Sequence, residues 1–276
     1  MPTQPPTREA GVLKGRFKKT IVRTPFEAPA LRLEEILGYP HRARHPEFAP
    51  IFGEGRCIER FLRTTLSAES NCIDIGCHLG IMLSAFARIA PLGAHIAFEP
   101  IPEKAAWLRA KFPEYEIHET ALSSRDDHAA TFFINRDSTG YSGLNRHCEP
   151  GDELIETRVA CRRLDDVLPP ERRVDFIKVD VEGAELQVLL GAERILLRQR
   201  PLLLFESTQS ALAAASVATR DVFDFLDRVG YSIFLPQLFT DGAAPLDLTS
   251  FHRAHEFPFA AFNFIGVPRG ATRGQR

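Results

Sequence analysis

The sequence lacks long hydrophobic runs. Among its 276 residues, no stretch approaches the roughly 18 uninterrupted apolar residues that a membrane-spanning helix needs. The first residues, MPTQPPTREAG, contain no apolar segment of the kind found in secretory signal peptides. These absences predict a cytoplasmic protein with no membrane segment and no membrane partner.

Cysteine is also scarce and irregularly placed. The five cysteines are an odd number, with no Cys-x-x-Cys pair and no regular spacing. This pattern predicts neither a disulfide framework nor a zinc ribbon, and it fits a reducing compartment. Cys72 and Cys77 flank a predicted buried strand, where we expect small core residues rather than nucleophiles.

Neither sign of charge dominates, since the net charge is −2. The net charge is +5 over residues 1–24 and +3 over residues 269–276, so the body between them is acidic at −10. An acidic body with short basic ends is not typical of nucleic-acid-binding proteins, and we expect the ends to be solvated. The 44% of hydrophobic and 25% of charged residues are ordinary for a globular domain.

The chain divides into an N-terminal extension, residues 1–66, a catalytic domain, residues 67–268, and a basic tail, residues 269–276. Residues 1–24 are predicted to be loosely ordered. The pattern of residues 25–66 predicts a short helix over Ala30–Leu37, a break at Gly53-Glu-Gly55 and a second helix from Ile58 to Leu66.

From residue 71 onward, strand-like and helix-like segments alternate. The strands are predicted over Asn71–Gly76, Ala94–Phe98, Tyr115–Thr120, 129–134, 157–162, Val174–Val181, Pro201–Phe205, Tyr231–Leu235 and Phe259–Val267. The helices are predicted over Leu79–Ala90, Pro102–Lys111, Ala184–Arg198 and Val217–Val229, with Ala211–Ala218 as a helix start. This alternation predicts an α/β fold with a mainly parallel sheet and helices on both faces.

The first strand leads into the glycine-containing turn Asp74-Ile-Gly76-Cys-His78-Leu-Gly80. Glycines at this place allow the backbone to approach a ligand closely, and a following helix N-terminus offers free N–H groups. The spacing is not the GxGxxG of dinucleotide binders, which argues against a nicotinamide-dependent oxidoreductase. By itself, the turn is better explained as a tight strand-to-helix connection.

Acidic residues follow several predicted strands. Glu99 ends the second strand, where a carboxylate can accept hydrogen bonds from both hydroxyls of a ribose. Asp180 and Glu182 follow a buried strand, at the sheet edge where open α/β sheets bind their ligands. The alternative role for these two acids is to cap the next helix. Glu206 ends a further strand and is expected at the same edge.

Together these segments resemble the FkbM family of methyltransferases, which depend on S-adenosylmethionine (SAM). The resemblance rests on the Asp74–Gly80 turn, Phe98-Glu99-Pro100, Ala121-Leu122-Ser123 and the string from Ile177 to Glu185. It covers about residues 70–235 and implies a Rossmann-like class I methyltransferase fold. One departure is His78, where the family more often has Asn, another side chain that can donate a hydrogen bond.

The resemblance also implies roles for single residues. The turn with Asp74, Gly76, His78 and Gly80 would hold the methionine end of SAM, with backbone N–H groups on its carboxylate. Glu99 would bind the ribose. Two residues at the end of the third strand, Ala121 and Leu122, would contact the adenine. Asp180 would face both the methyl donor and the methyl acceptor.

The expected reaction is O-methylation of a hydroxyl on a small molecule or sugar. An alcohol acceptor gains from a general base, and the candidates are Asp180, Glu182, Glu206 and His78. A divalent metal held by strand-end acids is the less favoured arrangement. The segment Gly140-Tyr-Ser142-Gly143 is predicted to be a loop over the site, with Ser142 and Glu182 near the acceptor.

Alternatives stay open at this point. The same fold can methylate an amine or a carboxyl group, and a non-catalytic nucleoside-binding or partner-docking module would share the cofactor motif. The identity of the acceptor, the role of residues 1–66 and the oligomeric state do not follow from the residues.

Overall fold

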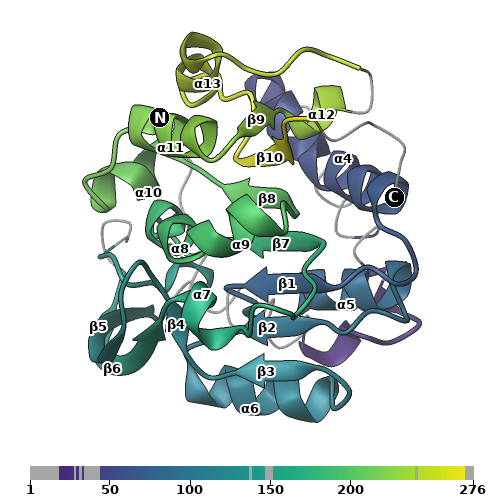
Figure 1. Ribbon diagram of the computed structural model, residues 1–276, viewed down its shortest axis with the longest axis vertical. Helices are drawn as coiled ribbons and strands as arrows, with labels where there is room; N and C mark the ends of the chain where they lie inside the picture. The colour runs from purple at the N-terminus through teal and green to yellow at the C-terminus, as the bar shows by residue number, and fades with distance from the viewer. Residues whose placement is uncertain are drawn as a thin grey trace.

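A seven-stranded sheet forms the centre of the molecule (Figure 1). The computed structural model describes residues 19–27, 29–30, 33, 44–136, 139–146, 152–239 and 242–270. Several sequence predictions lie outside these residues: the basic segment before residue 19, most of the helix predicted over Ala30–Leu37, Cys148 and the end of the basic tail.

The sheet has the strand order β3-β2-β1-β7-β8-β10-β9. All strands run parallel except β10, which is antiparallel to both of its neighbours. The strands are β1 (Cys72–Ile75), β2 (Ile96–Phe98), β3 (Glu116–His118), β7 (Phe176–Val179), β8 (Leu202–Glu206), β9 (Tyr231–Phe234) and β10 (Asn263–Pro268). The predicted α/β class with a mainly parallel sheet is confirmed.

Helices cover both faces of this sheet (Figure 1). One face carries α4 (Ala49–Thr65), which follows the single turn η1 (Pro46–Phe48), together with α5 (Ile81–Ile89), α6 (Pro102–Lys111) and α12 (Pro236–Phe239). The other face carries α7 (Leu164–Val167), α8 (Glu185–Gly191), α9 (Glu193–Arg198), α10 (Gln209–Ala214), α11 (Thr219–Arg228) and α13 (Leu248–Ala254). In the described part of the chain, no helix combines the length and the apolar character needed to cross a membrane.

Helix α4 corrects the prediction of a break at Gly53-Glu-Gly55. Both glycines lie inside the helix, which runs without interruption from Ala49 to Thr65. Glycine costs about 1 kcal/mol in a helix interior, but tertiary packing overrides that preference. Ile58, Phe61 and Leu62 bury one side of α4 in the same hydrophobic cluster as the sheet.

The helix predicted over Ala184–Arg198 is two helices, α8 and α9, separated at Ala192. The reason is a tertiary contact, because the Asp165 carboxylate accepts the N–H groups of Arg194 (2.7 Å) and Ile195 (3.1 Å) at the start of α9. The Ala211–Ala218 segment is likewise not a helix start. It contains the end of α10 and the turn before α11.

A second, three-stranded sheet stands beside the carboxyl edge of the main sheet. It has the order β4-β6-β5, with β4 (Ala121–Leu122), β5 (Asp127–Asn135) and β6 (Leu154–Arg162). Ala121 and Leu122 therefore do not end the third strand, as predicted, but form a strand of their own that pairs with β6. The single turn η2 (Thr139–Tyr141) lies in the connection from β5 to β6.

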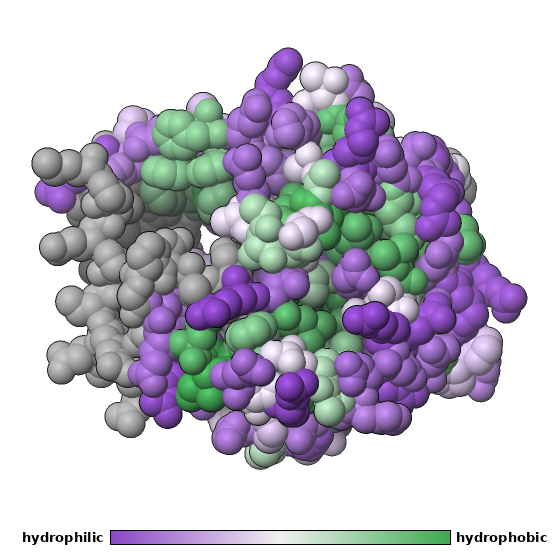
Figure 2. Space-filling model, turned by 90° about the vertical axis from the view of Figure 1, so that its left-hand side faces the viewer, coloured by the Kyte–Doolittle hydropathy of each residue, from purple (hydrophilic) through white to green (hydrophobic). Residues whose placement is uncertain are grey.

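The parallel strands end together at one edge of the main sheet. The arrows of β1 and β2 end on the left-hand side of Figure 1, and this side faces the viewer in Figure 2. Figure 2 shows patches of apolar side chains at this surface, surrounded by polar ones. Ligands of open α/β sheets bind at this edge, and the predicted site residues gather there.

Candidate active site

A cleft opens at the carboxyl edge, between the ends of β1 and β2 and the small sheet. Its empty volume, including the space open to solvent at the mouth, is about 510 Å³. Phe98, Ile101 and Phe132 give it apolar walls. Of the residues predicted from the sequence, those that line it are Gly76, His78, Glu99, Ala121, Leu122, Ser142 and Asp180.

The two glycines of the first turn have left-handed backbones but different surroundings. Gly76 has φ +77°, and a Cβ placed there would lie 1.8 Å from the carbonyl oxygen of Asp180. Gly80 has φ +74°, and its Cβ would meet Leu108 and Phe112 of the α6 segment at 2.9 and 2.8 Å. The close approach at Gly80 is therefore to the hydrophobic core, which corrects the prediction that it leaves room for a ligand.

The N–H groups of this turn are largely engaged within the protein. Those of Gly76 and Cys77 donate to the Phe98 carbonyl at 3.1 Å, and that of Gly80 donates to the Cys77 carbonyl at 2.8 Å. The N–H of His78 donates to Glu99. The expectation that these N–H groups are free to bind a cofactor carboxylate is therefore wrong for these four residues.

Glu99 is a buried carboxylate at the wall of the cleft, with 4% of its surface exposed. It accepts N–H groups from His78 at 2.9 Å and from Ile101 at 3.0 Å, one on each oxygen. His78 has φ +50°, in the left-handed region that Asn and His adopt more readily than most residues. Burial raises the pKa of Glu99, against the opposing effect of the Lys104 ammonium and of the two N–H groups.

The donor and acceptor set fits the cofactor that the resemblance implies. Each oxygen of Glu99 has one further acceptor position beyond its bond to the backbone, as needed for two ribose hydroxyls. The apolar side chains of Ala121, Leu122 and Phe132 line the same cleft and suit the face of an adenine ring.

Lys178 connects Asp74 with Asp180 beneath the cleft. Its ammonium lies 3.5 Å from Asp74 Oδ1 and 3.0 Å from Asp180 Oδ2, and it donates to the Gly76 carbonyl at 3.3 Å. Asp74 is completely buried and does not line the cleft, so the structure places it behind the site. Asp180 borders the cleft with a side chain that is 37% exposed.

The charge of this group is set by opposite effects. Burial alone would lower the pKa of Lys178, but the carboxylates of Asp180 and Asp74 raise it above its usual range. Burial alone would raise the pKa of Asp180, but the Lys178 ammonium holds it below its usual value. Asp180 is therefore an ionised carboxylate at neutral pH.

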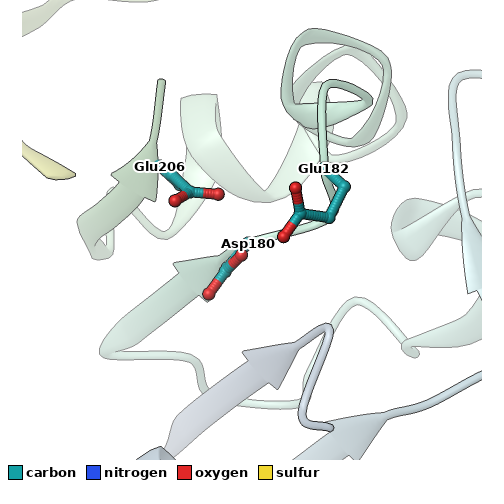
Figure 3. Close-up of side chains that lie close together, drawn as sticks. All are labelled: Asp180, Glu182 and Glu206. Atoms are coloured by element: carbon teal, nitrogen blue, oxygen red, sulfur yellow. The ribbon is translucent and has the colours of Figure 1, made fainter. Parts of the chain in front are cut away.

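Asp180, Glu182 and Glu206 form a cluster at the ends of β7 and β8 (Figure 3). One carboxylate oxygen from each lies within 4.8 Å of the others. Burial and the charges of Asp180, Glu182 and Glu185 raise the pKa of Glu206 well above that of an ordinary glutamate. Oxygen clusters of this kind can hold Mg²⁺, and they also occur without an ion.

Neither Asp180 nor Glu182 caps the helix that follows. The N-cap of α8 is Ala184, which has no side-chain cap, so the alternative considered from the sequence is wrong. Glu185 organises this loop instead, because its carboxylate accepts the N–H groups of Val181 (2.9 Å) and Gly183 (3.2 Å). Burial raises the pKa of Glu185 to about 7.

The segment around Ser142, which was predicted to be a loop over the site, borders the cleft. Gly140, Ser142 and Gly143 line the cleft, and the Ser142 hydroxyl accepts the Asn135 N–H at 3.1 Å. A Cβ on Gly143 would lie 3.2 Å from Cβ of Glu182, so the loop packs directly on the acidic cluster.

Sequence reasoning missed Lys178, Glu185 and Lys104. A signal for Lys178 was available, because a lysine inside the apolar run Phe-Ile-Lys-Val lies two residues before Asp180 and therefore on the same face of the strand. Lys104 is buried against the cleft beside Glu99, and burial lowers its pKa to about 8. The site roles implied by the resemblance stay predictions for all these residues.

The model of the family described as "Methyltransferase FkbM domain" matches residues 74–233, which is more than half of the chain. The 2-O-methyltransferase NoeI of Sinorhizobium fredii is 28% identical over 172 residues, covering 56% of this chain and 70% of NoeI. Methyltransferase 1 of Beauveria bassiana is 27% identical over 147 residues, covering 45% of this chain and 59% of that protein.

A third relative, the AMB antimetabolite synthetase AmbE of Pseudomonas aeruginosa, is 23% identical over 211 residues. That match covers 62% of this chain but only 10% of AmbE. Among solved structures, the methyltransferase FkbM of Methylobacillus flagellatus KT matches with a TM-score of 0.45 and 16% identity, covering 73% of this chain and 44% of that one. The plantazolicin methyltransferase BpumL in complex with SAH matches with a TM-score of 0.42 and 11% identity, covering 96% and 100%.

Proposed function

This chain belongs to the FkbM family of SAM-dependent methyltransferases, and from that premise we propose that it methylates a hydroxyl group on a small molecule or sugar. The observation that carries this proposal is the acidic cluster of Asp180, Glu182 and Glu206 beside the cleft, where burial and the neighbouring charges raise the pKa of Glu206. A carboxylate with a raised pKa is a stronger base than an ordinary one, and an alcohol needs a base to become a good nucleophile.

The cleft walls would bind the cofactor. We assign the ribose hydroxyls to Glu99, whose two oxygens are fixed by backbone N–H groups, and the adenine to Ala121 and Leu122. Gly76 lets the turn after β1 pass close to the backbone of Asp180 at the cleft. SAM, when bound, supplies a methyl group on a good leaving group, so that positioning provides much of the rate acceleration.

Asp180 and Glu206 would divide the remaining work. Asp180, held ionised by Lys178, places a negative charge at the cleft, where it favours a cationic cofactor and can accept a hydrogen bond from the acceptor hydroxyl. Glu206 in its ionised form would take the proton from that hydroxyl. We place Glu182 and Ser142 near the acceptor, because the loop with Ser142 borders the cleft and packs on Glu182.

The hydroxyl is favoured over an amine or a carboxyl group for one further reason. NoeI, which is 28% identical over 172 residues, is named a 2-O-methyltransferase. An acceptor that is already an anionic carboxylate would be repelled by three clustered acids, and it would not need a base.

The proposal is tested by incubating the protein with labelled SAM and a panel of hydroxylated metabolites and oligosaccharides, next to matched amines and carboxylic acids. Transfer of label to an oxygen of a hydroxylated acceptor is the expected result. Transfer to nitrogen or to carboxyl groups alone would overturn the hydroxyl assignment. Tight SAM binding without transfer to any acceptor would favour a nucleoside-binding module.

Asp180→Asn separates a role in chemistry from a role in cofactor binding. Loss of a group that polarises the acceptor lowers kcat by roughly 10²–10⁴-fold and leaves the Kd for SAM nearly unchanged. Loss of a cofactor contact weakens SAM binding instead. Full turnover in Asp180→Asn, measured beside the wild type, would remove Asp180 from the mechanism.

A further inference from the structure

We propose that Glu54, in the helix that precedes the catalytic fold, is a positioning residue that holds the strand pair carrying Glu206. This inference rests on the proposed function only in taking Glu206 as the group that is positioned. It assigns a role to one residue of the N-terminal extension, residues 1–66, whose function did not follow from the amino-acid sequence.

Glu54 is a buried carboxylate, with 5% of its surface exposed. Its Oε1 accepts the N–H of Phe262 at 2.8 Å and the N–H of Asn263 at 3.0 Å, and its Oε2 accepts the side-chain amide of Asn263 at 2.7 Å. All three donors lie at the start of β10 or on the residue just before it, more than two hundred residues away in the chain.

The residues that Glu54 holds are the direct neighbours of Glu206. Asn263 is the antiparallel partner of Glu206 in the pair of β10 and β8. Directly opposite residues of an antiparallel pair project to the same face of the sheet. The next residue, Ser207, donates its N–H to the Phe262 carbonyl at 2.8 Å. The backbone at Glu206 is therefore bonded to the two residues that Glu54 fixes.

The carboxylate of Glu54 makes a different kind of contact from the rest of the surface between α4 and the sheet. The neighbouring residues of α4 that face the sheet, Ile58, Phe61 and Leu62, are apolar and pack in the hydrophobic cluster. A buried carboxylate is costly unless its hydrogen bonds serve a purpose, and burial raises the pKa of Glu54 despite the three donors. Apolar packing would attach α4 to the sheet, whereas the carboxylate of Glu54 accepts the backbone N–H groups at the residue paired with Glu206.

Glu54 acts through the backbone and not through its charge. The groups that set the charge of Glu206 are Asp180 directly after β7, Glu182 in the following loop and Glu185 on α8. None of them belongs to α4 or β10, so replacing Glu54 leaves these charges in place and changes how firmly Glu206 is held among them and how far water reaches it.

The test uses three separate variants of the full chain, each with one substitution at Glu54. Glu54→Ala removes the acceptor and is expected to lower kcat by about 10–100-fold, because small displacements of a catalytic group are costly. The kcat of Glu54→Gln is expected to stay within about threefold of the wild type, since its amide oxygen still accepts both backbone N–H groups. Its NH₂ can donate to the side-chain oxygen of Asn263 once the amide group of Asn263 has flipped. Glu54→Asp, which is one methylene shorter, is expected to fall between them and serves if the alanine variant does not fold.

Asp165→Ala is the matched control. Asp165 is also a buried carboxylate that accepts two backbone N–H groups from a distant segment, but it lies at the start of α9. The Asp165→Ala variant should lose stability as Glu54→Ala does. Its kcat should stay within about threefold of the wild type at a temperature where circular dichroism shows the variant to be folded. The Kd for SAM should stay within about threefold in all variants, because the cofactor cleft lies at β1 and β2.

A direct readout keeps this inference separate from the proposed function. Carbon NMR of glutamate carboxyl groups, with Glu206 assigned from the spectrum of Glu206→Gln, follows its titration whether or not Glu206 is the base. In Glu54→Ala the midpoint of Glu206 is expected to move toward that of an ordinary glutamate, because a loosened strand lets water reach it. An unchanged midpoint, or an equal loss of kcat in Asp165→Ala, would overturn the positioning role. Full turnover in Glu206→Gln would overturn the proposed base alone.

Discussion

Two glutamates stand at the carboxyl edge of the same sheet in opposite electrostatic surroundings. Glu99 follows β2 and is bound by two backbone N–H groups, with the Lys104 ammonium nearby. Glu206 ends β8 and is surrounded by Asp180, Glu182 and Glu185. Burial raises the pKa of both, but around Glu99 every specific polar neighbour except Asp74 opposes that rise, whereas around Glu206 the acidic neighbours add to it.

The difference shows how one residue type is suited to two tasks. Donors aimed at a carboxylate stabilise its charged form and fix its orientation, which serves the recognition of hydroxyl groups. Like charges around a carboxylate destabilise its charged form, which serves proton abstraction. The residue type is the same, and the neighbours decide its use.

The largest effect is expected at Gly76, which lines the cleft on the side of Glu99 and lies against the backbone of Asp180 in the acidic cluster. Gly76→Val introduces a β-branched side chain at φ +77°, with its Cβ 1.8 Å from the Asp180 carbonyl oxygen. We expect SAM binding to be lost in calorimetry and the unfolding temperature to fall sharply. Gly55→Ala, where an added Cβ meets nothing within 4 Å, is the control and should raise the free energy of unfolding by about 0.5–1 kcal/mol. Normal SAM binding by Gly76→Val would mean that this turn takes no part in binding the cofactor.

Glu206→Gln tests the acidic region by itself. Its kcat should fall by roughly 10²–10⁴-fold, while the Kd for SAM stays close to that of the wild type. In the wild type, kcat should rise with pH as Glu206 loses its proton, because only the ionised form accepts one. The variant should lack this rise. A wild-type profile that is flat from pH 6 to 9 would contradict the assignment of Glu206 as the base.

Glu99→Ala tests the cofactor region in the same way. Loss of the charge-assisted contacts to the ribose should weaken SAM binding by about 1.5–3 kcal/mol, measured by calorimetry, with a smaller effect on kcat at saturating SAM. Glu103→Ala, on the exposed first turn of α6, is the matched control and should bind SAM as the wild type does. Equal affinities of Glu99→Ala and Glu103→Ala would show that Glu99 is only structural.

The smallest effect is expected from Glu185→Gln, which removes one acid from the surroundings of Glu206. The folded state keeps the proton of Glu185 up to a pKa of about 7, above the ordinary value, so the free energy of unfolding falls as the pH rises through that window. The glutamine variant should lose this part of the pH dependence. In urea titrations, the free energy of unfolding of Glu185→Gln relative to the wild type should therefore be about 1–3 kcal/mol more favourable to the folded state at pH 8 than at pH 5. A difference from the wild type that is the same at both pH values would contradict the raised pKa.

Local sequence patterns determined much of the fold. Alternating apolar segments predicted the parallel sheet and most of its helices, because burial on one or both faces leaves a periodic trace in the chain. Their positions at or just after strand ends placed Gly76, Glu99, Asp180 and Glu206 at one edge, since parallel strands end together. The resemblance to FkbM methyltransferases rested on these same segments.

The tertiary structure decided what depends on distant neighbours. The break between α8 and α9 is made by Asp165, and the continuity of α4 through two glycines is made by its packing on the sheet. The pKa of Glu206 depends on side chains that only the folded chain brings together, and its strand is tied to Glu54 across the length of the chain. Periodicity records burial, whereas charge and position depend on the particular atoms nearby, and those contacts leave no periodic trace in the sequence.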